Sequence, residues 1–389
     1  MSDTRAEVVL SGAELEATMA FFTELGFRLV MIAPADAPMV AVMEGHGLTI
    51  RCGGTAGPDT GAAVLRLPLE AVPAEGLSTE GLSTEGLSTE GLSTEGQSVG
   101  GLSVGGSLVE RRLVAPNGTI IELVSSDPAL VLPPLVPSFT IDRAEGAEWH
   151  PGRAGMGYRD LIADRQGGRF IASHISIPNG GPVPDYVHHH HIRFQMIFCR
   201  RGWAKLVYQD QGEPFLLNAG NCVIQPPHIR HQVLETSDAF EVVEVGTPAV
   251  HETRVDHQMT LPNTDGPVDT VFGGQHFVHH QRQGASWTPW RFDGLVAREF
   301  GFDAATDGLA EARVVRPDPD SEGGGGSFAH DGEFVFWFMV DGKAGLERSG
   351  EHHQLGPGDA VTLPAGEAFK LHDLSSDFEL LEVTLPATA

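Results

Sequence analysis

From about residue 140 to residue 386, the sequence consists of short β-type runs separated by Gly and Pro. The first runs include FQMIFCRRGWAKLVYQ, PFLLNAGNCVIQPP and AFEVVEVGTP. Short strands with regular turn signals are typical of an all-β sandwich or barrel. The same texture returns from about Gln275 to Pro386, with EFVFWFMVDGKAGLERSG, HQLGPGDAVTLPAG and FELLEVTLP. We therefore predict two β barrels that are internal copies of each other.

The first 125 residues follow a different pattern. AEVVLSG is followed by the helical segment AELEATMAFFTELG and by FRLVMIAP, MVAVMEG and LTIRC, which is a β-α-β-β-β order. A weaker second copy ends in a hairpin at Asn117-Gly118. Between its runs lie the pentapeptide repeats of residues 76–105, whose period of five fits neither a helix nor a strand. We expect a flexible loop there, with a solenoid coil as the alternative.

At 389 residues the chain exceeds one core of ordinary size, so we expect more than one domain. The proline-rich segment DPALVLPPLVPS separates the α+β pattern from the β runs. We predict domains at 1–130, 131–262 and 263–389. Three cysteines lie far apart without CxxC spacing, which predicts buried thiols rather than disulfides or a thiolate zinc site; they are Cys52, Cys199 and Cys222.

The formal net charge of −27 argues against partners that are themselves negatively charged. Such a chain would repel a nucleic-acid backbone and an anionic lipid surface, and no run of Lys and Arg offers a local exception. The first residues, MSDTRAEVVLSG, form neither a basic segment nor an apolar run of signal-peptide length. We expect a cytoplasmic homodimer that binds a small molecule and has neither nucleic-acid nor membrane partners.

Four consecutive histidines, His188 to His191, stand in the first barrel region within DYVHHHHIRFQMIF. Residues i and i+2 of a strand point to the same side, so a His-x-His pair can supply two imidazole ligands from one strand. The run contains two such pairs, His188 with His190 and His189 with His191. The residues alone allow either pair to hold a metal, and they also allow a strand that is merely polar.

A second segment, GNCVIQPPHIRH, sets Gly220, Pro226 and His231 at the spacing expected of a second histidine-bearing hairpin. The two blocks together resemble the motifs of the cupin superfamily, G(X)5HXH(X)3,4E(X)6G and G(X)5PXG(X)2H(X)3N. Three positions depart from these motifs, because Gln195 replaces Glu, His228 replaces Gly and Glu235 replaces Asn. The resemblance implies a mainly β bicupin: two double-stranded β-helix or jelly-roll barrels, preceded by the α+β domain of βαβββ type.

Relatives in one subgroup of this superfamily resemble VHxHx[VI]RFQM, which aligns His188 and His190 with the ligand positions and leaves the other two histidines variable. The resemblance thus implies His188, His190 and His231 as metal ligands, with Gln195 as a weak or absent fourth ligand. A neutral Gln195 makes the metal a stronger Lewis acid with open positions for an anionic substrate and dioxygen. The donor set fits Fe(II), with Ni, Mn, Co or Zn as alternatives.

Arg193 and Arg230 flank these ligands in the sequence. Together with Gln195 they are our candidate catalytic residues, since a guanidinium could pair with a substrate carboxylate; solvated strand-edge arginines are the alternative. The resemblance implies a metal-dependent oxidoreductase, specifically a mononuclear Fe(II) dioxygenase for a small oxygenated, anionic or aromatic metabolite. A cupin isomerase, lyase or hydrolase is one alternative, and a non-catalytic bicupin that binds a small molecule is another.

The second barrel region keeps only part of this pattern. His330 remains, but Phe328 and Phe369 stand where the other two histidine ligands belong, and Glu333 is too little to complete a site. We expect a degenerate cupin domain without metal. Its aromatic strand forms core or lines a small apolar pocket; the residues are Phe334, Phe336, Trp337 and Phe338.

Residues 5–125 resemble the paired modules of the glyoxalase/vicinal-oxygen-chelate superfamily, through FFTELGF after the helix and APNGTIIELV at the close. Members that bind a metal place His or Glu on the first and last strands of a module. Glu7 and Glu122 stand at such places. We expect them to be structural carboxylates in a degenerate, metal-free domain.

Overall fold

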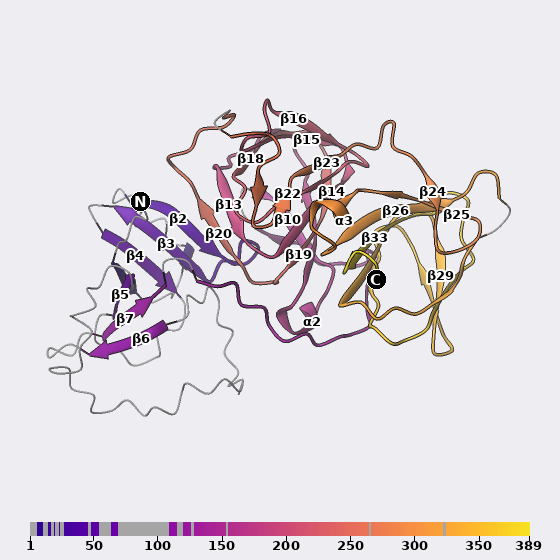
Figure 1. Cartoon of the computed structure of the whole chain (residues 1–389), viewed down its shortest axis with the longest axis horizontal. Coiled ribbons are helices and arrows are strands. Elements are labelled where there is room, and N and C mark those ends of the chain that lie inside the picture. Colours follow the sequence, from indigo (N-terminus) through magenta and orange to yellow (C-terminus); the bar gives the residue numbers. More distant parts are fainter. Residues whose placement is uncertain are drawn as a thin grey trace. The chain divides into compact units, whose positions relative to one another are not determined.

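The computed structural model describes residues 6–10, 27–45, 48–53, 64–68, 109–114, 120–125, 128–152, 155–263, 266–321 and 324–389, with single residues between 15 and 23. The chain divides into two compact units, residues 1–130 with 250–255 and residues 131–249 with 256–389 (Figure 1). The pentapeptide repeats of residues 76–105 and the turn at Asn117-Gly118 lie outside the described residues. Within the described ranges, no helix is long and apolar enough to cross a membrane.

The first unit contains two groups of strands that repeat one pairing pattern. Strand β1 is parallel to β4, which is antiparallel to β3, and β5 is likewise parallel to β7, which is antiparallel to β6. The two groups join where β1 pairs with β5, and β2 lies between β3 and β20. The strands are β1 (Glu7–Leu10), β2 (Arg28–Ala33), β3 (Val40–Gly45), β4 (Leu48–Gly53), β5 (Val64–Pro68), β6 (Val109–Val114), β7 (Ile120–Val124) and β20 (Glu252–Val255).

The predicted β-α-β-β-β order holds for the first of these groups. Between β1 and β2 the described residues Leu15, Glu16, Met19 and Thr23 are helical, and the Thr23 hydroxyl donates to the Met19 carbonyl at 2.8 Å. The likeness to the glyoxalase/vicinal-oxygen-chelate superfamily stays a prediction, because it rested on sequence patterns alone.

The second unit begins with a barrel made of two antiparallel sheets. One sheet has the order β23-β17-β14-β19-β11-β10-β9, and the other has the order β16-β15-β18-β13 with β12 on β18. An apolar core lies between them, with Val223 and Val242 from the first sheet and Leu206 from the second. The strands are β9 (His150–Pro151), β10 (Gly157–Asp160), β11 (Ile171–Ile177), β12 (Gly181–Pro182), β13 (His188–His191), β14 (Phe194–Arg201), β15 (Trp203–Tyr208), β16 (Phe215–Asn218), β17 (Cys222–Ile224), β18 (His231–Thr236), β19 (Phe240–Thr247) and β23 (Val278–His280).

The second barrel has the same construction. Its sheets have the orders β24-β25-β26-β33-β28-β31-β8 and β27-β32-β29-β30, around a core that includes Val335, Leu346 and Leu371. The mainly β fold class with two double-sheet barrels is therefore confirmed. Its strands are β8 (Thr140–Asp142), β24 (Thr288–Pro289), β25 (Leu295–Glu299), β26 (Glu311–Pro317), β27 (Gly326–Phe328), β28 (Phe334–Asp341), β29 (Ala344–Arg348), β30 (Glu351–Leu355), β31 (Ala360–Thr362), β32 (Phe369–His372) and β33 (Glu379–Leu385). The hairpin β21 (Val271–Phe272) with β22 (Gln275–His276) and the short helices α2 (Arg165–Gly168) and α3 (Phe302–Ala305) complete the unit.

Reciprocal contacts relate the two barrels as internal copies. Strand β8 comes before the first barrel but pairs with β31 of the second, and β23 lies beyond residue 262 but pairs with β17 of the first. Arg159 donates to the Gly358 carbonyl at 2.6 Å, and Arg298, its counterpart, donates to the Gly220 carbonyl at 3.0 Å. Each barrel thus contributes a strand and a buried arginine to the other.

The large sheets of the two barrels share an apolar core. Because side chains alternate along a strand, Phe334, Phe336 and Phe338 enter this shared core, whereas Trp337 enters the core inside the second barrel. All four aromatic side chains are fully buried. They therefore form two separate parts of the core, which confirms the core prediction, and the alternative of one pocket lined by all four is wrong.

The three cysteines are free and buried, as predicted. Burial raises the pKa of Cys199 to about 12 and raises the pKa of Cys222 well above its ordinary value. A thiol with a raised pKa stays protonated near neutral pH and is a poor nucleophile, so these side chains act as small apolar groups.

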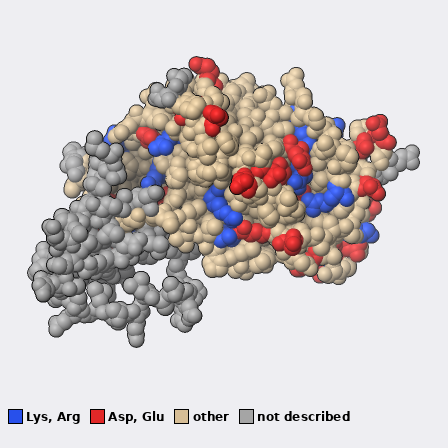
Figure 2. Space-filling view, in the orientation of Figure 1, with Lys and Arg blue, Asp and Glu red and all other residues tan. Residues whose placement is uncertain are grey.

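Charged side chains of both signs are interspersed on the surface that Figure 2 shows. On this face Lys and Arg lie beside Asp and Glu instead of forming a separate basic area. Among the described residues, Arg143 and Asp359 form one ion pair of this kind, at 2.8 Å.

Candidate metal centre

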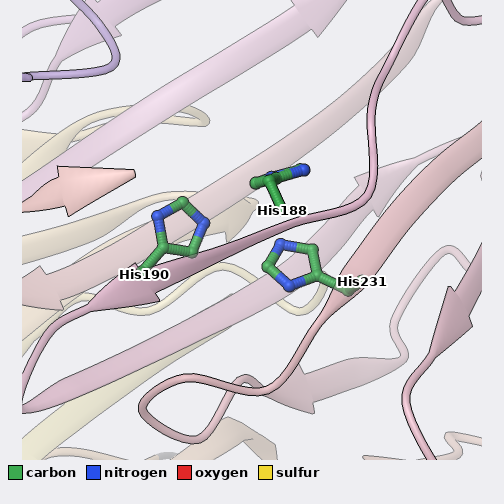
Figure 3. A group of neighbouring side chains, drawn as sticks. All are labelled: His188, His190 and His231. Carbon is green, nitrogen blue, oxygen red and sulfur yellow. The ribbon is translucent and has the colours of Figure 1, made fainter. Parts of the chain in front are cut away.

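Strand β13 directs its four histidines alternately to the two sides of the sheet. His188 and His190 are buried, with 2 % and 8 % of their surface exposed, whereas His189 and His191 are only partly buried. His188 lies opposite His231, on the neighbouring strand β18, which is also buried. The three buried rings point toward one another (Figure 3), and their potential ligand atoms all lie within 4.8 Å of one another.

The other two histidines of the run, His189 and His191, lie near His228, which is not part of the run. The ring centroids of His189 and His191 lie 5.6 and 5.2 Å from that of His228. His228 has a φ of 67°, the left-handed conformation that glycine adopts most readily, which accounts for the Gly that the cupin motif has at this position. Its backbone N–H donates to the His190 carbonyl at 3.0 Å and holds the hairpin against β13.

Backbone carbonyl groups orient two of the three buried rings. His188 Nδ1 lies 2.7 Å from the Tyr186 carbonyl oxygen, and His231 Nδ1 lies 3.1 Å from that of Ile229. A carbonyl oxygen can only accept, so each Nδ1 is the donor and each Nε2 of a neutral ring carries the lone pair. This is the tautomer that a metal-binding histidine needs, and the donor set therefore fits a divalent metal ion.

Gln195 stands at the inner side of β14, and one residue, Gln225, connects it by hydrogen bonds to His231. Its Nε2 donates to Glu244 Oε1 at 3.1 Å, and its Oε1 accepts from Gln225 Nε2 at 3.3 Å. The same Gln225 nitrogen lies 3.0 Å from His231 Nε2, a bond that a metal ion would replace. Gln195 thus reaches His231 through Gln225, and its predicted role as a direct ligand stays a prediction.

Tyr208 completes this polar group. Its hydroxyl donates to Gln225 Oε1 at 2.9 Å, and its ring stacks on His231 with centroids 5.3 Å apart. Burial raises the pKa of Tyr208, so the hydroxyl remains a donor. Sequence reasoning missed Tyr208, Gln225 and Glu244. The available signal was a single polar residue on an otherwise apolar strand, as in CVIQPP.

The two arginines that we proposed as catalytic are both engaged by carboxylates. Arg193 Nη1 lies 3.1 and 3.0 Å from the two carboxylate oxygens of Glu333, in the second barrel, and Arg169 pairs with the same carboxylate at 2.6 Å. Arg230 Nε donates to Asp256 at 3.3 Å. Each guanidinium is therefore already paired with a carboxylate, which weakens its attraction for an anionic substrate.

The remaining sequence candidates also have structural partners. Glu7 pairs with Arg51 at 2.9 Å, and Glu122 pairs with Arg66 at 2.8 Å. Each of these two candidate carboxylates therefore neutralises an arginine. His330 Nε2 donates to the Leu363 carbonyl at 2.8 Å, which turns this nitrogen away from a metal-binding role.

No protein-family model and no curated protein matches this chain. Among solved structures, protein Ylba from E. coli is similar over 66 % of this chain and 93 % of its own, with 10 % identity and a TM-score of 0.48. Oxalate decarboxylase from Lactobacillus farciminis has 16 % identity over 66 % and 90 % of the two chains, with a TM-score of 0.46. Salicylate 1,2-dioxygenase from Pseudoaminobacter salicylatoxidans has 13 % identity over 66 % and 83 %, with a TM-score of 0.47.

Proposed function

We propose that the chain is a metal-dependent cupin enzyme, with His188, His190 and His231 as ligands of one divalent metal ion. The observation that carries the proposal is the convergence of three buried imidazoles, two of them held by backbone carbonyl groups in the tautomer that leaves Nε2 for the metal. Without an ion, the nitrogen atoms of three buried imidazoles would each need a hydrogen-bond partner from the protein, because burying a polar group without one is unfavourable.

We further propose a mononuclear Fe(II) centre that activates dioxygen toward a small oxygenated metabolite. Imidazole ligands suit iron, and the three of them leave coordination positions open. When bound, the metal would supply Lewis acidity and a place for two oxygen-containing reactants. Because Gln195 is neutral, it adds no negative charge next to the three histidines. The Glu244 carboxylate behind it accepts a hydrogen bond from Gln195 Nε2 at 3.1 Å and so orients the amide.

The test begins with metal content, because the chain offers matched pairs of histidines on one strand. His190→Ala should lose the metal, since two imidazoles rarely hold a divalent ion, whereas His191→Ala should retain it. His188→Ala and His231→Ala should behave as His190→Ala does. Metal loss that is equal in His190→Ala and His191→Ala would reject the assignment of ligands, provided that both variants keep the parental melting temperature.

Dioxygen use is tested on the Fe(II)-loaded protein in an oxygen electrode, with a panel of hydroxylated aromatic acids and 2-oxo acids. Oxygen uptake that is stoichiometric with substrate loss, and that is absent in His190→Ala, is the expected result. Substrate loss without oxygen uptake would instead indicate the isomerase, lyase or hydrolase alternative. Bound metal without turnover of any compound would favour a non-catalytic binding protein.

A further inference from the structure

A second group of side chains of the types that bind metals lies on the outer face of the small sheet of the second barrel, away from the positions that correspond to His188, His190 and His231. Glu347 on β29 is directly opposite His352 on β30, and His372 on β32 is directly opposite Gly345 on β29. Opposite residues of paired strands project to the same face. Leu346 and Leu371, one residue along, point into the barrel core.

The register thus brings a carboxylate and two imidazoles from three strands together. The potential ligand atoms of Glu347, His352 and His372 all lie within 4.8 Å of one another, as those of the first centre do. The ring centroids of His352 and His372 are 5.9 Å apart. His352 is exposed, and the other two side chains are half-buried.

The ring of His372 is held ready to bind through one nitrogen. Its Nδ1 lies 2.9 Å from a carboxylate oxygen of Asp373, while its Nε2 is buried and has no hydrogen-bond partner. An ionised carboxylate can only accept, so Nδ1 carries the hydrogen and Nε2 the lone pair. A carboxylate behind a histidine is the usual support of a metal-binding imidazole, and a buried acceptor without a partner is otherwise unfavourable.

Gly345 provides the space in which this ring lies. A Cβ atom at position 345 would approach His372 Cε1 to 2.4 Å and Nε2 to 2.9 Å. Any other residue would therefore displace the imidazole from its place on the strand. The ring position thus depends on the absence of a side chain at 345, an observation independent of the donor atoms themselves.

We propose that Glu347, His352 and His372 bind a divalent transition-metal ion of the zinc class, with Asp373 supporting His372. Two imidazoles and one carboxylate are a donor set that zinc accepts, and they leave a coordination position for water or another ligand. Lys370 lies 3.7 Å from the Glu347 carboxylate and competes with the ion for it. The bound ion would link β29, β30 and β32 and so stabilise the second barrel. This proposal is independent of the proposed function.

The experiment measures Zn²⁺ binding by titration calorimetry on the full chain that carries His190→Ala, which removes one ligand of the first centre. The expected result is one Zn²⁺ per chain, with affinity reduced at least about 100-fold by His372→Gln and by His352→Gln, since each removes one of three ligands. His353→Gln is the matched control. His353 neighbours His352 on β30 but packs near Phe139, with ring centroids 5.6 Å apart, and this variant should bind like its parent.

Two further variants examine the supporting residues. Asp373→Asn should weaken Zn²⁺ binding about 10- to 100-fold, the usual effect of losing a partner behind a ligand. Lys370→Gln should strengthen binding several-fold, because Glu347 loses its competing cation. Co²⁺, added in place of Zn²⁺, should give a visible absorption spectrum that His352→Gln abolishes. His352 is exposed, so this variant remains informative if His372→Gln fails to fold.

Two outcomes would overturn the proposal. The first is that the chain with His190→Ala binds no Zn²⁺ even when the free ion is in large excess. The second is that His352→Gln binds Zn²⁺ as tightly as His353→Gln, which would place the ion elsewhere. Loss of metal from the first centre does not affect either outcome.

Discussion

The two barrels of the second unit place different side chains at equivalent positions of equivalent strand pairs. In the first barrel His188 on β13 lies opposite His231 on β18, and in the second Phe328 on β27 lies opposite Phe369 on β32. His190 and His330 also correspond, because their backbone carbonyls accept equivalent hydrogen bonds. The donor is the N–H of His228 in the first barrel and the N–H of Gly366 in the second. A single architecture thus holds three imidazoles in one barrel and two aromatic rings beside one imidazole in the other.

The residues behind the ligand positions are also polar in the first barrel and apolar in the second. Register places Val335 where the first barrel has Gln195, and the Leu363 N–H donates to Val335 as the Gln225 N–H does to Gln195. Val335 and Leu363 belong to the apolar core of the second barrel. From this comparison we infer that the three-histidine arrangement depends on the ligands and their polar supports together.

The largest effect is expected from forcing the ligands of the first barrel into the second. Phe328→His with Phe369→His would complete a three-histidine set with His330. The unfolding free energy should fall by about 3–5 kcal/mol, because two aromatic rings are lost from the core and two imidazoles are buried beside apolar neighbours. Urea denaturation measures the change. A double variant that is as stable as the parent would show that the ligands alone make the difference between the barrels.

The second largest effect is expected from removing one polar support from the first barrel. Gln225→Leu copies Leu363 and leaves the Tyr208 hydroxyl without its acceptor. Stability should fall by about 1–3 kcal/mol, and metal affinity should fall about 10- to 100-fold, measured by calorimetry. Gln232→Leu is the control, because Gln232 bonds to the Asp185 carbonyl at 2.8 Å and is an adjacent residue of His231 on β18. Equal loss of affinity in both variants would contradict a specific role for Gln225.

Local rules predicted which histidines converge, but they did not predict the polar residues behind them. The choice of His188 and His190 followed from the two-residue alternation of a strand and from the family resemblance, both of which are visible within one segment. The supports were not predictable, since Gln195 meets Glu244 across 49 positions of sequence. The pairing of Arg193 with Glu333 and the exchange of β8 and β23 likewise depend on how distant strands align.

A smaller effect is expected from Gln195→Glu, which introduces the residue that the cupin motif has at this position. A carboxylate at 195 would lie beside Glu244 and destabilise the metal-free protein, but it would attract a divalent ion. Metal affinity should therefore rise by the equivalent of about 1–3 kcal/mol, and affinity for an anionic substrate should fall by a similar amount. Metal-dependent shifts in melting temperature measure the first effect. Adding Glu244→Gln should restore the stability of the metal-free protein; if it does not, the two side chains do not interact.

The smallest effect is expected on the pH dependence of stability, at one pair of equivalent positions in the two barrels. In the first barrel His174 Nε2 lies 3.0 Å from Glu241, whereas register places Val314 and Glu379 at the same positions in the second. The hydrogen bond from His174, assisted by Arg200, lowers the pKa of Glu241 from 4.5 to about 2, and burial lowers the pKa of His174. The folded protein therefore binds the Glu241 proton less readily than the unfolded chain does. Glu241 thus stabilises the folded state above about pH 4.5, and this contribution is lost as the pH falls toward 2.

Because the Glu241 carboxylate is partly exposed to solvent, its contribution at neutral pH should be about 1 kcal/mol. Urea denaturation of Glu241→Gln should show this deficit at pH 7 and a progressively smaller one between pH 4.5 and pH 2. His174 should act in the same direction, since its lowered pKa also makes the folded state resist protonation below pH 6.5. Glu379→Gln is the matched control, because the residue that corresponds to His174 in the second barrel is Val314. A Glu241→Gln deficit that stays constant from pH 7 to pH 2 would mean that the hydrogen bond with His174 does not distinguish the two barrels.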